Sequence, residues 1–196
     1  SIMIAMKFGF ARGVFSNEAG LGTAPMAHGA SNSKNPIEQG LWGIFEVLID
    51  TFFVCTLTGL MAIIFLEANQ GTKLNGAELI SASFGANLGH AGSIILTVSL
   101  ILFAFSTFVG WSHYGVVALG YLTKRNKIAS YGYRIIFLII GIIGAVAQLD
   151  LIWSIADTLN GLMAIPNLIG LLILSPKVAK LTRDYLKDPS STIMKD

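Results

Sequence analysis

The segment Arg12–Pro25 holds the residue types best suited to chemistry, because an acid, polar side chains and several glycines interrupt an apolar stretch. Glycines such as Gly20 and Gly22 weaken a helix, and Ser16 and Asn17 can bond backbone groups that a helix would otherwise use. In lipid, an unwound backbone is tolerated only where protein or a water-filled cavity surrounds it. Membrane proteins use such breaks to hold a carboxylate at half-helix amino termini and a cation at freed carbonyls. The pattern predicts either such a binding site or a kinked, re-entrant helix kept for close packing.

A second group of polar side chains interrupts the apolar run Ser93–Leu122. Ser106 and Thr107 offer hydroxyl oxygens, which suit a hard cation such as sodium by extension of the rule for calcium and magnesium. Trp111 lies four residues after Thr107, so it projects from the same helix face one turn along. The alternative is that both hydroxyls bond their own preceding carbonyls, as lone serines and threonines do in membrane helices.

Acidic residues inside apolar runs form a third group. Glu46 and Asp50 are spaced i, i+4, so both carboxylates face one side of a helix. They could bind a cation, relay protons, or pair with Arg12 or Lys7 in a structural or gating role. Asp157 lies roughly 10 Å into the last apolar run on the helical rise, where an outer gate or a polar contact is expected.

Glu18 and His113 complete the set of ionisable candidates. An acid in the membrane is costly and is normally functional or paired, so Glu18 is expected either to balance Arg12 or to cap the amides of a second half-helix. His113 has no second histidine or cysteine at metal-ligand spacing, and Cys55 is the only cysteine. No transition-metal site is therefore expected.

The elements that position these residues are apolar helices. Only 12% of the residues are charged, about half the share of a soluble domain, and spanning a bilayer takes about 20 mostly apolar residues. We expect a broken helix over residues 1–25, a short surface helix over Gly76–Leu88, and a tight link at Gln148–Leu151 between the last two spans. Four stretches are predicted to span the membrane: Leu41–Leu66, Ser93–Leu122, Ile128–Gln148 and Leu151–Leu174.

The basic residues predict which side of the membrane each loop faces. If the first segment ends inside, the inner loops are Met26–Gln39, Thr123–Arg134 and Ser175–Asp196, and the outer loops contain only Lys73. The carboxyl-terminal tail, residues 176–196, is then cytoplasmic. The inner loops contain ten basic residues: Lys34, Lys124, Arg125, Lys127, Arg134, Lys177, Lys180, Arg183, Lys187 and Lys195.

Other classes of function receive less support. The net charge is only +2 and the basic residues form no patch, so no nucleic-acid partner is expected. A membrane-embedded enzyme or a proton-handling subunit would use Glu18, Glu46, Asp50 and His113. No nucleophile–base pair, metal motif or cofactor loop accompanies them, so the chain is not expected to be an enzyme. No basic region follows Ser1, so no cleavable signal is expected and the chain opens as if in mid-sequence.

Ordered motifs resemble those of the alanine/glycine:cation symporter family. The residues Ala11–Pro25, which read ARGVFSNEAGLGTAP, resemble its signature. Further matches follow at Pro36–Gly40, Asp50-Thr51 with Cys55-Thr56, Ala104–Ser112, and Asp157 with Gly161–Leu168. The resemblance implies an all-α integral membrane protein with a LeuT-like fold of two inverted five-helix repeats. This chain resembles the second repeat, with its first helix broken; alone, without the first repeat, it is expected to be inactive.

The same resemblance implies a function: sodium-coupled symport of alanine or glycine across the cell (inner) membrane, with protons as the alternative coupling ion. It places Phe15, Ser16, Asn17, Gly20 and Trp111 in the substrate pocket. In related carriers the helix that matches Ser93–Leu122 gives hydroxyl ligands to sodium, a role that Ser106 and Thr107 match by position. Gating or polar pairs are expected among Arg12, Glu18, Glu46, Asp50 and Asp157.

Cysteines placed at Asn75 and Asn126 test the predicted topology. An impermeant thiol reagent reaches only the outer side of intact cells, so we expect labelling at Asn75 and none at Asn126, with both labelled after permeabilisation. Labelling at Asn126 in intact cells contradicts the topology.

Overall fold

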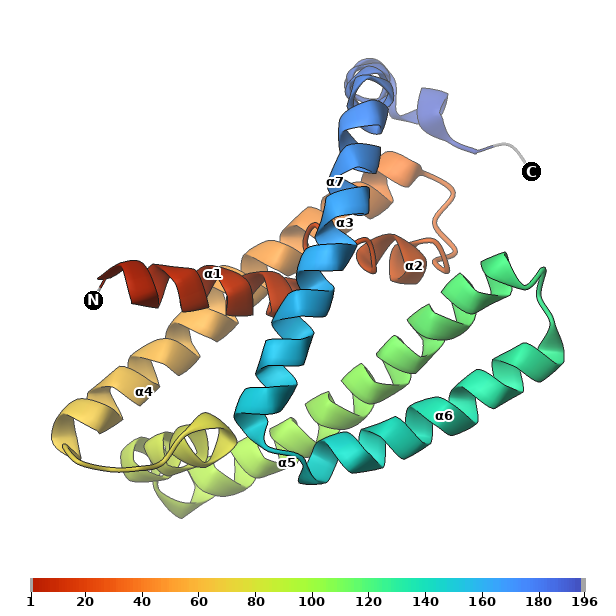
Figure 1. The fold of residues 1–196 in the computed structure, drawn as a ribbon. Helices are drawn as coiled ribbons and strands as arrows, with labels where there is room; N and C mark the ends of the chain where they lie inside the picture. Colours follow the sequence, from red (N-terminus) through yellow and green to blue (C-terminus); the bar gives the residue numbers. More distant parts are fainter. Residues whose placement is uncertain (1, 195–196) are drawn as a thin grey trace. The chain divides into compact units, whose positions relative to one another are not determined.

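The computed structural model describes residues 2–194, and all regular secondary structure in this range is helical (Figure 1). Lys195, one of the ten basic residues counted above, lies outside the described residues. Four helices are long and apolar enough to cross a membrane: Pro36–Ala68, Gly76–Leu122, Lys127–Val146 and Leu149–Lys187. The expectation of an all-helical membrane protein is therefore confirmed. The described chain forms two compact units. One consists of the residues up to Val47 together with those from Ser112 on, and the other is Leu48–Trp111.

The first apolar segment is interrupted. Helix α1 (Ile2–Asn17) ends where Glu18 takes a left-handed conformation with φ 54°, and the short helix α2 (Ala24–His28) follows. Gly20 and Gly22, with φ of 85° and 86°, shape the connection, which a residue with a Cβ would adopt only with strain. Glycine content thus breaks the helix at the position that the sequence indicates.

The next apolar stretch contains a feature absent from the sequence prediction. Helices α3 (Pro36–Leu48) and α4 (Thr56–Ala68) are joined by a π-helical segment, η1 (Ile49–Cys55). Its wider turn lets the Thr56 hydroxyl donate to the carbonyl oxygen of Thr51, five residues earlier, at 3.2 Å. Such π segments recur at functional sites, and here one contains Asp50.

Helix α5 (Gly76–Leu122) consists of two helical parts that meet at Gly89, one covering the predicted surface helix and the other the predicted span. The chain bends at Gly89, whose φ of 70° and ψ of −165° are not helical. Before the bend, Ser83 is fully buried and its hydroxyl donates to the Leu79 carbonyl at 2.6 Å. A Cβ at Gly85 would overlap the Ser93 hydroxyl, so the residues before and after the bend pack closely.

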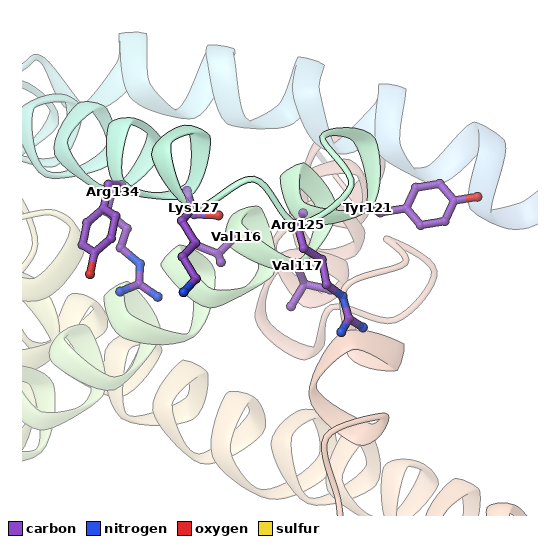
Figure 2. Close-up of a pocket in the computed structure, with 9 residues that line it drawn as sticks. Val116, Val117, Tyr121, Arg125, Lys127 and Arg134 are labelled. Atoms are coloured by element: carbon purple, nitrogen blue, oxygen red, sulfur yellow. The ribbon is translucent and has the colours of Figure 1, made fainter.

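Helix α6 (Lys127–Val146) returns beside the end of α5, and Figure 2 shows the turn between them. Asn126 caps α6: its side-chain oxygen accepts from the amides of Ile128 and Ala129 at 2.8 and 3.3 Å. Helix α7 (Leu149–Lys187) follows almost at once, as the short link predicts. It continues past Pro176, which lies beyond the predicted end of the span, because the lysine-, alanine- and leucine-rich residues after it favour a helix.

The carboxyl-terminal residues fold back on the link between α2 and α3. The 3-10 turn η2 (Pro189–Thr192) places the Thr192 hydroxyl 3.1 Å from the Asn35 side-chain oxygen, to which it donates. The amide of Met194 donates to the Lys34 carbonyl at 2.8 Å. Hydrogen bonds from the Ser190 amide and hydroxyl hold the pKa of Asp188 below its usual range. These contacts fix the segment that connects the broken helix to the first long span.

Candidate functional site

The break between α1 and α2 is among the best-covered parts of a chain that otherwise exposes its apolar side chains. Leu21 and Thr23 are each 3% exposed, and Leu21 is the only buried large apolar side chain among residues 2–194. Ile139 on α6 and Leu172 on α7, by contrast, are 52% and 74% exposed, as lipid-facing residues should be. Protein therefore covers the irregular segment at Leu21 and Thr23 and in part at Gly20 and Gly22, whereas Ala19 is exposed. Such cover is the condition for unwinding inside a membrane.

Helix α7 contacts the broken segment both before the break and within it. Nη1 of Arg12 lies 2.5 Å from Oδ1 of Asp157. A Cβ at Gly22 would lie 3.1 Å from Oδ1 of Asn167, so the glycine allows close approach of α7 to the backbone. These two contacts join the broken segment to α7 at Arg12 and at Gly22.

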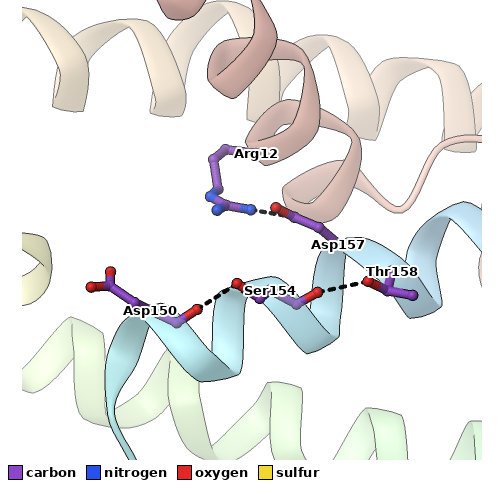
Figure 3. A network of polar contacts seen from close by, with 5 residues as sticks. All are labelled: Arg12, Asp150, Ser154, Asp157 and Thr158. Atoms are coloured by element: carbon purple, nitrogen blue, oxygen red, sulfur yellow. Dashed lines mark hydrogen bonds and ion pairs between the residues drawn. The ribbon is translucent and has the colours of Figure 1, made fainter.

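The charge of Arg12 is satisfied from two sides. Asp157 on α7 accepts its hydrogen bond, as the dashed line in Figure 3 marks. The Trp153 ring, one turn earlier on α7, lies 3.6 Å from the guanidinium carbon, an arrangement worth roughly 0.5–2 kcal/mol. Phe15 packs edge-on against the same ring, with the centroids 5.2 Å apart. Arg12 therefore pairs with Asp157, whereas the sequence left Glu18, Glu46 and Asp50 as candidate partners.

Glu18 is attached to a different helix. Tyr114, on the last part of α5, makes a side-chain hydrogen bond to Glu18. Asn17 takes up one of the freed backbone groups, because its Oδ1 accepts from the Ala19 amide at 2.9 Å. The carbonyl of Glu18 accepts from the Leu21 amide at 3.2 Å. Asn17 and Glu18 thus hold the turn itself.

Thr23, which sequence reasoning did not single out, contributes an unusual group to the break. Its hydroxyl is buried and has no hydrogen-bond partner within residues 2–194. Thr23 precedes α2 yet makes no capping hydrogen bond. Leaving such a group unsatisfied costs about 1–3 kcal/mol, so the oxygen is suited to a cation or a polar ligand. The sequence feature that could have indicated Thr23 is its position between Gly22 and Pro25, in a glycine-rich stretch.

Helix α2 is held by α3. Nδ1 of His28 lies 2.8 Å from the Gln39 side-chain nitrogen, and its Nε2 lies 3.7 Å from Glu46 Oε2. Asp50 has a different neighbour, because the Cys55 thiol donates to it at 4.0 Å within η1. Glu46 and Asp50, which would share one face of an α-helix, thus have separate partners. The π-helical segment begins at Ile49, between them, so the α-helical spacing does not hold here.

The residues expected on the third span lie in the second unit. Ser106 donates its hydroxyl to the Phe103 carbonyl at 3.0 Å, which leaves its oxygen lone pairs for another partner. Thr107 and Trp111 lie on the same helix, and none of the contacts described above for the break involves these three residues. No group of three or more His, Cys, Asp or Glu side chains in the described part of the chain could hold a metal ion.

Comparison with known proteins assigns the chain to one group of relatives. The profile of the sodium:alanine symporter family matches residues 1–195. The sodium/alanine symporter AgcS of Methanococcus maripaludis is 49% identical over 183 residues, which cover 92% of this chain and 40% of the relative. The probable sodium/glutamine symporter GlnT of Bacillus subtilis is 38% identical over 93% of this chain and 38% of the relative.

A more distant relative, the putative sodium/proton-dependent alanine carrier protein YrbD of Bacillus subtilis, is 31% identical over 94% of this chain and 41% of the relative. The chain spans about two fifths of the length of these curated relatives. No solved structure matches it.

A double-mutant cycle tests the Arg12–Asp157 pair. Arg12→Gln and Asp157→Asn each leave one charge beside Trp153 without its partner, whereas the double variant leaves none. In the full-length protein, meaning this chain with the remaining segment that its relatives contain, we expect each single variant to lower the melting temperature. The double variant should recover part of the loss, with a coupling of about 0.5–3 kcal/mol.

Asp150→Asn is the matched control, because Asp150 lies on the same helix and its carboxylate points away from Arg12 (Figure 3). Additive losses in the cycle, or an equal loss in Asp150→Asn, contradict the pairing.

Proposed function

The chain belongs to the sodium:alanine symporter family, and on this premise we propose that it is part of a carrier that couples uptake of a small neutral amino acid, alanine or glycine, to a sodium gradient. The observation that carries the proposal is the break between α1 and α2. It is partly covered by protein, its backbone leaves the helical conformation, and it contains the buried hydroxyl of Thr23 without a partner among the described residues. Such a site suits a ligand with a carboxylate and a small side chain.

In this proposal the amino acid binds at the break. Phe15, Ser16, Asn17 and Gly20 come from the break and its approach, and Trp111 comes from α5. The left-handed turn at Gly20 lets the ligand approach the backbone without a Cβ in the way. Phe15 packs against Trp153, so its ring has a defined position from which to limit the size of the pocket.

Sodium binds in this proposal with hydroxyl ligands from Ser106 and Thr107. The Ser106 hydroxyl donates its hydrogen to the Phe103 carbonyl, so the lone pairs of its oxygen remain available to a cation. Hard cations prefer such oxygen ligands. Ion and substrate together stabilise one occluded state, which is how binding couples their movement. A proton is the alternative coupling ion.

Two polar contacts are placed to gate the site. Arg12–Asp157 with Trp153 ties the outer half-helix α1 to α7. His28–Glu46 ties the inner half-helix α2 to α3. Because the two ties lie on opposite sides of the break, breaking one while keeping the other opens a single side. Glu18 holds the turn through Tyr114, and Asp50 shapes the π turn η1.

The remainder of the carrier completes this site. The relatives are longer than this chain, and we propose that the full-length carrier, meaning this chain with the remaining segment that its relatives contain, adds a first five-helix repeat of a LeuT-like fold. On this proposal the chain alone does not transport. The carrier lies in the cell membrane with the carboxyl terminus in the cytoplasm, as the basic loops predict.

Uptake by the full-length carrier in proteoliposomes tests the function and the ion site together. We expect an inward sodium gradient to accumulate labelled alanine and a proton gradient alone to drive none. Ser106→Ala or Thr107→Ala should raise the sodium concentration for half-maximal uptake, because losing one ligand costs about 1–3 kcal/mol, or roughly five- to 150-fold.

Thr97→Ala is the control, because it removes a hydroxyl from the same helix that, like that of Ser106, donates to a carbonyl of its own helix but is not proposed as a ligand. Unchanged sodium dependence in both variants removes them from the site. Conversion of alanine into a new compound favours a membrane-embedded enzyme instead.

Trp111 sets the size limit of the substrate. Its ring occupies space that a larger side chain needs, so removing it should admit leucine and methionine while weakening alanine through lost contact. The measurement is inhibition of labelled alanine uptake by leucine and by methionine. We expect Trp111→Ala to lower the inhibition constants of leucine and methionine by about tenfold. Trp42→Ala, which removes an exposed tryptophan of α3, should leave them unchanged. A well-expressed, active Trp111→Ala carrier with an unaltered inhibition profile excludes Trp111 from the pocket.

A further inference from the structure

A basic cavity lies where α5 ends and α6 begins, away from the contacts that hold the break. Its volume is about 680 Å³, and Arg125, Lys127 and Arg134 line it. Figure 2 shows these three side chains extending to the same side of the hairpin, whereas Tyr121 points away from them. Within residues 2–194 none of the three is in an ion pair, and no acid lines the cavity. Three like charges around one hollow repel one another, and an anion between them relieves that repulsion.

The backbone of the turn fixes the position of these cations. Lys124 and Arg125 have φ of 52° and 61°, a left-handed conformation that residues with a Cβ adopt only when the surroundings impose it. The Arg125 amide donates to the Gly120 carbonyl at 2.7 Å, which closes the end of α5. Asn126 already occupies the first free amides of α6, so the side chains, not the helix terminus, are available to an anion.

The two helices approach each other closely at one point beyond the turn. A Cβ at Gly115 would overlap the Tyr133 hydroxyl, so α5 and α6 meet there with no room for another side chain. The Gly115–Tyr133 contact therefore joins the two helices that bound the cavity.

The apolar surroundings decide what kind of anion fits. Val116, Val117 and Tyr131 line the cavity beside the cations. Further along α6, Ile135 and Ile139 are 59% and 52% exposed, so an apolar surface continues from the cavity towards the centre of the membrane. A free phosphate would use the cations alone, whereas a phospholipid uses both: its phosphate binds the cations and its acyl chains lie along α6.

We propose that this hairpin binds an anionic phospholipid of the cytoplasmic leaflet, with the phosphate group held by Arg125, Lys127 and Arg134. Basic cavities between helices on the cytoplasmic side recognise anionic lipid head groups in this way. The bound lipid joins the ends of α5 and α6 to the membrane surface. The site does not depend on the transport proposed above, because its ligand and its residues differ.

Lipid binding to the purified full-length carrier tests the proposal. The probes are phosphatidylglycerol, phosphatidylcholine and inorganic phosphate, with bound lipid counted by native mass spectrometry and thermal stability measured in parallel. We expect phosphatidylglycerol to bind and stabilise, and the other two to do neither. Substituting all three cations by glutamine should abolish the bound phosphatidylglycerol, and each single substitution should weaken it by about fivefold.

The matched control is Lys177→Gln, Lys180→Gln and Arg183→Gln together, which removes the same charge from α7 outside the cavity. It should leave binding intact. Equal loss in this control shows attraction to basic residues in general and overturns the site. Equal binding of phosphatidylcholine, or stabilisation by inorganic phosphate alone, overturns the assignment of an anionic lipid. If the triple variant does not fold, unchanged affinity in all three single variants overturns it as well.

Discussion

The rest of the structure depends on one constraint: peptide groups that leave a helix cannot be left to lipid. Between Asn17 and Ala24 the chain is not helical, and each unsatisfied peptide group in hydrocarbon costs several kcal/mol. Neighbouring side chains and helices contact this non-helical segment. Asn17 bonds a freed amide, Tyr114 anchors Glu18, and α7 lies against Gly22 so closely that only a glycine fits without displacement. The backbone groups left over, with Thr23, are the chemistry available to a ligand.

Charges within the apolar region follow the same rule. Arg12 is compensated by a carboxylate and by an aromatic face, both from α7. Helix α2 is tied through His28 to α3. The break therefore lies between two polar ties, one to each neighbouring helix. In the proposed carrier, coupling of a cation to an amino acid requires that both ligands stabilise the occluded state. The occluded state is the one in which both polar contacts, Arg12–Asp157 and His28–Glu46, are formed.

Sequence patterns predicted the local features and left out those that depend on tertiary contacts. The break was predictable, because glycines and short polar residues act on their own backbone. The partner of Arg12 was not, because nothing local distinguishes Asp157, 145 residues away, from Glu18 or Glu46. The π turn at Asp50 was also missed, since an i, i+4 pattern presumes an α-helix. Helix α7 passes Pro176 although a proline commonly marks an end, because the residues after it favour a helix. The roles proposed for Ser106, Thr107 and Trp111 rest on family resemblance and remain predictions.

The central claim is that the break between α1 and α2 is where sodium and the amino acid bind. Its most direct test is the rate at which a water-soluble thiol reagent modifies a cysteine at Ser16, an exposed position at the end of α1. The measurement uses the full-length carrier with Cys55 replaced by serine. The account predicts that alanine slows modification when sodium is present and has no effect when choline replaces it. A modification rate that alanine and sodium together leave unchanged, in a variant that still transports, contradicts the claim.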